Sequence, residues 1–148
     1  MDEYLHGKIN PTFVRFAVDD KDYIIKMLNP AARTAAVRAY RNQFKSILSC
    51  AGKRPVTVLF LPSNVAVSES AFEYRGQLGF TTDTRMLTFD FDDMVQSAIS
   101  GYNVSYVSLL SDFRSDGCPN CYFPWDRHLT PAGNRRVAEF VARNIELK

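Results

Sequence analysis

The N-terminal residues show the alternation and turn chemistry of a β-hairpin. The run Thr12–Val18 is rich in β-branched and aromatic residues, and Tyr23–Ile25 is a second run of the same kind. Between them, residues 19–22 (Asp-Asp-Lys-Asp) are typical of a turn. We therefore expect a hairpin over residues 12–28, as an extension in front of the remaining domain.

A long amphipathic helix is predicted directly after this hairpin. Asn29 and Pro30 suit the N-cap and the first helical position, and Gly52 is a plausible stop. Apolar residues then recur at helical spacing on one face. They are Val37, Tyr40, Phe44, Ile47 and Leu48. Arg33, Arg38 and Arg41 lie elsewhere on the helix, and we interpret them as a solvated basic face.

Two short apolar runs further along the chain predict strands. Residues 56–61 and 104–109 are nearly continuous in β-formers, which is typical of parallel strands covered on both faces. Helical spacing over residues 92–100 lies between them, and one of Asp92 and Asp93 suits its cap better than a cation site. Residues 65–88 carry few signals beyond a short helix expected over 68–74.

The C-terminal residues predict a loop and a last helix, and these complete the expected architecture. A polar loop over residues 111–129 precedes a helix that begins at Thr130-Pro131. The order helix, strand, helix, strand, helix implies parallel strands joined by right-handed crossovers. We expect one α/β domain over residues 1–148, with a small, three-layered, partly parallel sheet flanked by helices and fronted by the N-terminal hairpin.

Composition and charge narrow the classes of protein. The chain has 148 residues, of which 46% are hydrophobic, and its net charge is only +2. A nucleic-acid protein needs a concentrated basic face, so we expect no nucleic-acid partner. The first residues lack the pattern of a signal peptide, and no apolar run is long enough for membrane insertion. The default expectation is a cytoplasmic protein; the alternative is a fragment of an exported or membrane-anchored one.

The three cysteines cannot all pair within one chain. Cys118 and Cys121 have CxxC spacing, while Cys50 stands alone. The spacing leaves open two unpaired loop thiols, a local disulfide, or a redox or metal role. A structural zinc site needs four ligands, and neither a second CxxC nor a histidine pair occurs. We therefore assign no metal and no cofactor.

The polar residues that suit catalysis follow the two predicted inner strands. In an open α/β sheet, ligands bind beyond the carboxyl ends of the strands. Ser63 and Asn64 come after the first strand, and the loop after the second delivers Asp126 and His128. An imidazole held by a neighbouring carboxylate is the usual general base of a triad. Ser63 could act as nucleophile and Asn64 as oxyanion donor, although Pro-Ser-Asn also suits an ordinary turn.

The residues around His128 add a family resemblance. The segment 122–134, Tyr-Phe-Pro-Trp-Asp-Arg-His-Leu-Thr-Pro-Ala-Gly-Asn, resembles the last sequence block of bacterial SGNH-type (GDSL-like) hydrolases and their O-acetyl-transfer relatives. With less specificity, the resemblance extends back to about residue 35. It implies that His128 is the base, that Asp126 orients it, and that Trp125 lies in the binding region. The implied substrate is a small ester or an acetylated glycan.

Two other blocks of that family are absent from the chain. No Gly-Asp-Ser nucleophile block and no Gly-x-Asn-Asp block occur. Residues 29–148 thus resemble the second half of the fold, and the activity we expect is that of a truncated or degenerate ester or O-acetyl hydrolase module. The alternative is a non-catalytic binding or assembly module on the same fold. A half-sheet exposes an edge strand that either the N-terminal hairpin or a second copy of the chain covers, and we expect a homo-oligomer.

Overall fold

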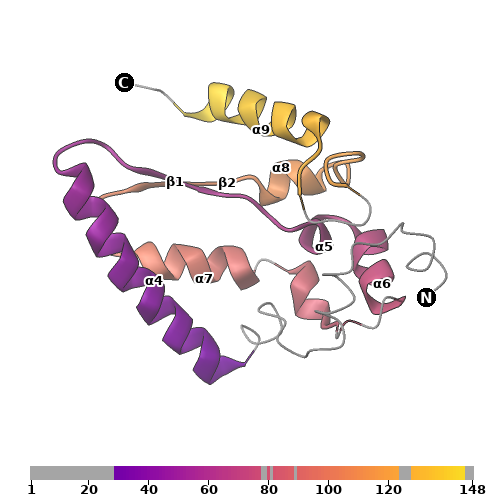
Figure 1. Ribbon diagram of the computed structural model, residues 1–148, viewed down its shortest axis with the longest axis horizontal. Coiled ribbons are helices and arrows are strands. Elements are labelled where there is room, and N and C mark those ends of the chain that lie inside the picture. Colours follow the sequence, from indigo (N-terminus) through magenta and orange to yellow (C-terminus); the bar gives the residue numbers. More distant parts are fainter. Residues whose placement is uncertain (1–28, 78–79, 81, 89, 124–127, 146–148) are drawn as a thin grey trace.

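The computed structural model describes residues 29–77, 80, 82–88, 90–123 and 128–145, and it is a mixed α/β structure with more helix than strand (Figure 1). Its elements, in chain order, are α4 (Pro30–Ala51), β1 (Thr57–Phe60), α5 (Asn64–Val67), α6 (Glu69–Gln77), the 3-10 turn η1 (Thr84–Leu87), α7 (Asp90–Ile99), β2 (Ser105–Ser108), α8 (Leu110–Arg114) and α9 (Pro131–Asn144). The expected hairpin over residues 12–28 lies outside the described residues.

The two predicted inner strands form a parallel pair. β1 and β2 are in register from Thr57 opposite Ser105 to Phe60 opposite Ser108. The connection between them runs through α5, α6, η1 and α7, which confirms a parallel crossover. Both strands are shorter than predicted, and neither has a fully buried residue. We expected both faces of the strands to be buried, but in the described residues they are only partly buried. A sheet of two short strands gives the helices little area to pack against.

The helix α4 begins and ends where the sequence predicts. The side chain of Asn29 accepts hydrogen bonds from the amides of Ala31 and Ala32, and Gly52 ends the helix with a positive φ of 63°. None of its 22 residues is buried. The apolar stripe is only half-covered, because Ile47 is 52% exposed.

The basic face of α4 is not simply solvated, which corrects the sequence-based interpretation. Arg33 donates to the carbonyl of Asp90 at 2.8 Å, and it forms an ion pair with that residue's carboxylate at 3.5 Å. Arg41 donates to the carbonyls of Ser97, Ala98 and Ser100 at 3.1–3.3 Å. The two guanidinium groups thereby bind opposite ends of α7, and the last turn of a helix is where orphan carbonyls need donors.

The structure contains two short helices that the sequence did not predict, α5 and α8, and α7 begins earlier than predicted. Asn64 begins the short helix α5, where the sequence indicated a turn. α8 occupies residues 110–114, which fall at the start of the expected loop. α7 begins at Asp90 rather than residue 92. These elements are only 4, 5 and 10 residues long, so their ends are set by tertiary contacts more than by propensity.

Asp92 lies inside the structure as a hydrogen-bonded carboxylate. It is 8% exposed and accepts from the hydroxyl of Tyr106 and, at 2.5 Å, from that of Ser108. Burial of the Tyr106 phenol, together with its hydrogen bond to the Asp92 carboxylate, raises the pKa of Tyr106 above the usual range. Asp92 thus connects α7 to β2, and it lies inside the helix rather than at the cap position that the sequence suggested.

The most enclosed part of the structure follows β2. Leu109 and Phe113 have no exposed surface, and they pack with Val67, Cys118 and Cys121. Partly buried residues of α9 and β1 complete this cluster: Leu59, Val137 and Phe140. In the described part of the chain, no helix is both long and apolar enough to cross a membrane.

Candidate functional site at the carboxyl end of β1

The chain leaves β1 and enters α5 within four residues. Ser63 occupies the N-cap position with an extended backbone, and its side chain makes no capping hydrogen bond. The side-chain oxygen of the next residue, Asn64, accepts from the amide of Val65 at 2.9 Å. Pro62, Ser63 and Asn64 are therefore positioned by the end of the strand and the start of the helix.

The segment that carries His128 is bound to the same carboxyl end of β1. Tyr122 and Leu129 form an antiparallel bridge, and the amide of Phe123 donates to the carbonyl of His128 at 3.1 Å. The hydroxyl of Tyr122 donates to the carbonyl of Pro62 at 2.5 Å. These contacts bring two segments that are 60 residues apart in sequence to one edge of the sheet, as the sequence analysis predicted for parallel strands.

Tyr122 is held by its ring as well as by its hydroxyl. The ring lies edge-on to that of Phe113, with centroids 6.1 Å apart. Burial raises the pKa of Tyr122 above the usual range, so the phenol stays protonated at neutral pH. The hydroxyl is therefore a permanent donor to Pro62.

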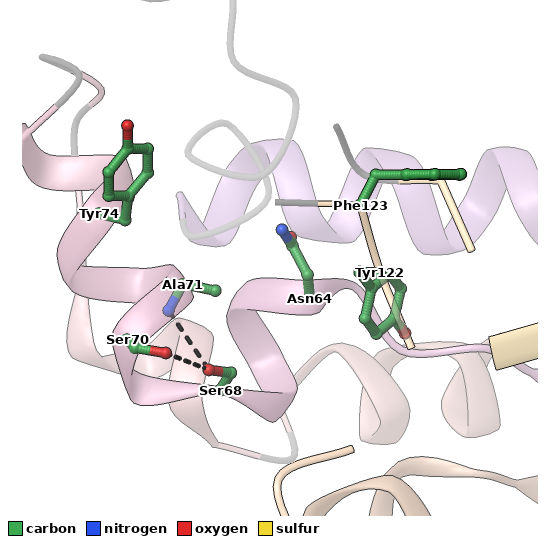
Figure 2. Close-up of a pocket in the computed structure, with 7 residues that line it drawn as sticks. All are labelled: Asn64, Ser68, Ser70, Ala71, Tyr74, Tyr122 and Phe123. Atoms are coloured by element: carbon green, nitrogen blue, oxygen red, sulfur yellow. Dashed lines mark hydrogen bonds between the residues drawn. The ribbon is translucent and has the colours of Figure 1, made fainter. Parts of the chain in front are cut away.

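A cavity of about 300 Å³ opens beside these residues (Figure 2). Its described lining combines aromatic, amide and hydroxyl side chains from α5, α6 and the Tyr122–Phe123 segment: Asn64, Ser68, Ser70, Ala71, Tyr74, Tyr122 and Phe123. In the close-up, the side chain of Asn64 points into the space between α6 and Phe123. Ser68 and Ser70, which also line the cavity, share a hydrogen bond of 2.8 Å.

The residues predicted for the site have different outcomes. Asn64 lines the cavity, whereas Ser63 is not among its described lining residues. His128 is exposed, and its main chain is bonded to Phe123, which lines the cavity. Asp126 and Trp125 lie outside the described residues, so the predicted pairing of Asp126 with His128 stays a prediction.

Two further features of the site were not assigned a role from the sequence. Tyr122 lies within the segment that carries the family resemblance, but nothing local indicates that its hydroxyl reaches Pro62. Tyr74 and the two serines belong to the stretch with few sequence signals. A short helix was expected over residues 68–74, and it is present as α6, so its existence was predictable while its lining role was not.

The start of α9 packs closely against the main chain of Cys121, next to the site. The side chain of Thr130 accepts from the amide of Gly133 at 3.1 Å, which is the predicted cap. A Cβ atom at Gly133 would lie 2.2 Å from the carbonyl oxygen of Cys121. Only glycine therefore allows α9 to approach the residue before Tyr122 this closely.

The structure decides between the alternatives for the cysteines. Cys118 and Cys121 form a disulfide, and both residues are almost fully buried. Cys50 is a free, exposed thiol. The first alternative, two unpaired loop thiols, is therefore wrong. Among the described residues, no cluster of histidine, cysteine and acidic side chains is arranged to hold a metal ion.

No family model, no curated protein and no solved structure matches this chain. The fold and site by themselves define an α/β protein with a small, partly aromatic cavity at the carboxyl edge of a parallel strand pair.

Proposed function

We propose that the chain is an SGNH-like module that acts on short acyl esters, with His128 as its base. The observation that carries the proposal is the hydrogen bond from Tyr122 to Pro62. It fastens the segment before His128 to the carboxyl end of β1, where Asn64 enters the cavity. The order of elements and the residue pattern of 122–134 support the same family. The finer three-layered architecture and the N-terminal hairpin belong to this proposal.

The roles of the residues follow from their chemistry. The imidazole of His128 takes a proton from water or from a hydroxyl nucleophile, and the carboxylate of Asp126 orients it. The amide of Asn64 donates to the acyl oxygen as negative charge develops there. The apolar part of the cavity, from Phe123 and Ala71, suits a small acyl group. Ser63 is retained as the nucleophile candidate because its side chain caps no helix.

Hydrolysis of p-nitrophenyl acetate tests this proposal, with His128→Ala as the variant and His6→Ala as its matched control. The chain has only these two histidines. We expect slow, saturable turnover, since a base without an activated nucleophile loses most of a triad's effect. His128→Ala should lower kcat/KM at least about tenfold, because a positioned base contributes roughly 10²–10⁴-fold at full efficiency.

The outcomes of this assay separate the roles. Equal rates in the two histidine variants would overturn the assignment of His128. Rapid turnover that disappears in Ser63→Ala would instead identify Ser63 as the nucleophile and contradict the expected slow rate.

The second candidate is a non-catalytic binding module. It is favoured by the position of Ser63 outside the described cavity lining and by the absence of the family's Gly-Asp-Ser block. Under this alternative, a small ester or acetylated glycan binds beside Asn64 and Phe123 without being hydrolysed. Saturable binding that is unchanged in His128→Ala, together with no hydrolysis above the buffer rate, would favour it.

A further inference from the structure

The disulfide between Cys118 and Cys121 closes a loop at the centre of the C-terminal region. The two Cα atoms are 5.5 Å apart, and the residues are 4% and 3% exposed. Both pack against Leu109 and Phe113, which have no exposed surface. The loop tip, Pro119 and Asn120, is exposed. The bridge itself is thus buried in the core, whereas the two residues that it encloses are exposed.

Two carbonyl groups of this loop accept hydrogen bonds from Thr130, the N-cap residue of α9. The carbonyl of Cys121 accepts from the amide of Thr130 at 2.9 Å, and that of Asn120 accepts from the Thr130 hydroxyl. The same hydroxyl accepts from Gly133 and so caps α9. Thr130 comes two residues after His128. The closed loop thus fixes the chain on the C-terminal side of His128.

The residues after the loop hold the main chain of His128 and Leu129. Tyr122 follows Cys121 directly, binds Pro62 through its hydroxyl and pairs with Leu129. Phe123 then donates to the carbonyl of His128. These contacts involve Tyr122 and Phe123, the two residues after Cys121, and they hold the main chain of His128 against Phe123, which lines the cavity.

Two residues of the loop that the disulfide closes have a positive φ. Cys118 and Asn120 have φ values of 46° and 62°, in the left-handed region that residues with a Cβ rarely adopt. A bridge between residues three apart restricts very little of the unfolded chain, because its stabilising effect grows with loop length. Its main consequence is therefore local, at the two strained residues and at the contacts they present.

We propose that the Cys118–Cys121 disulfide is a redox-sensitive positioning element for the site at His128. Reduction by a dithiol breaks the sulfur–sulfur bond; the cysteines gain two electrons and two protons, while the dithiol becomes its own disulfide. In the opened loop, the main chain relaxes at Cys118 and Asn120. The hydrogen bonds that position Tyr122 and Thr130 then weaken. The effect on catalysis rests on the proposed function, whereas the effect on the main chain does not.

Amide hydrogen exchange in oxidised protein, in protein reduced with dithiothreitol, and in the Cys118→Ser/Cys121→Ser variant tests the proposal. The reporters are the amides of Phe123 and Thr130, which bond to His128 and Cys121. The internal references are the amides of Ser105 and Leu109, which bond to β1 and its flank. Cys50→Ser, at the exposed free thiol, is the matched control.

We expect exchange at Phe123 and Thr130 to accelerate at least tenfold on reduction and to recover on reoxidation, while Ser105 and Leu109 change less than twofold. The kcat/KM for p-nitrophenyl acetate should fall in parallel, with no change in Cys50→Ser. Equal acceleration at all four amides, or none at Phe123, would overturn the positioning role. If His128→Ala leaves the hydrolysis rate unchanged, the proposed function fails. The exchange rates of the Phe123 and Thr130 amides still test the positioning role of the disulfide.

Discussion

The helix α4 and the region that follows β2 are held in place by different interactions. No residue of α4 is buried, and Arg33 and Arg41 bind it to the main chain of α7. After β2, by contrast, Leu109, Leu110 and Phe113 are at most 1% exposed, and a disulfide closes the adjoining loop. The first region is attached by arginine hydrogen bonds and a half-covered apolar stripe, and the second is packed in the core.

This difference shows what an apolar pattern can and cannot indicate. The helical spacing in α4 is regular, yet its stripe is only half-covered in the described structure. The segment 109–121 has no comparable periodicity, and it nevertheless supplies three of the four largest fully buried side chains in the described residues. Periodicity thus predicts which residues share a face, whereas burial depends on what the fold brings to that face.

Truncation of one apolar side chain in each region should give the largest contrast. Phe113→Ala removes a ring with no exposed surface, so we expect it to lower the free energy of unfolding by about 3–5 kcal/mol. Ile47→Ala, at a residue that is 52% exposed, should cost less than about 1 kcal/mol. Urea denaturation followed by circular dichroism measures both. Similar losses for the two variants would contradict the contrast.

The close approach of α9 to the disulfide loop should be sensitive to a single methyl group. In Gly133→Ala, the new Cβ would meet the Cys121 carbonyl oxygen at 2.2 Å and a Leu129 methyl at 2.9 Å. Because main-chain atoms must then move, we expect a loss of about 1–3 kcal/mol in the free energy of unfolding. The matched control is Gly76→Ala in α6, where the nearest atom is 3.7 Å away. That change should be neutral or stabilising by up to about 1 kcal/mol.

A smaller effect is expected where α4 is attached by a charged side chain. Arg41→Ala removes the donors to three carbonyls at the end of α7, which should cost about 1–2 kcal/mol in thermal or urea unfolding. Arg38→Ala, at an exposed residue of the same helix, should change stability by less than about 0.5 kcal/mol. If Arg38→Ala were as costly as Arg41→Ala, net charge and not the contact with α7 would explain the loss.

Local chemistry accounts for the features that the sequence predicted correctly. Asn29 and Thr130 cap their helices, and Gly52 ends α4, because each acts through neighbours within about four residues. The parallel strand pair was also predictable, from two apolar runs with helical patterns between them. Such signals need no knowledge of distant residues.

The candidate site was only partly predictable because its decisive contacts are non-local. Asn64 was placed correctly at the strand end, but the hydrogen bond from Tyr122 to Pro62 joins residues 60 apart and leaves no pattern in the sequence. The disulfide was one of several alternatives, since spacing alone does not fix the redox state. The interpretation of Arg33 and Arg41 as a solvated face failed for the same reason: their partners lie about 57 residues away.

The central claim is that Asn64 and His128 belong to one ligand site, and a titration of isotope-labelled protein with ethyl acetate tests it most directly. Two-dimensional NMR follows the side-chain amide of Asn64 and the imidazole of His128 in the same samples, with His6 as the internal control. We predict that the Asn64 and His128 signals shift along one binding curve with a common dissociation constant, while His6 does not respond. Shifts at Asn64 without any at His128, or equal responses of the two histidines, would contradict the claim.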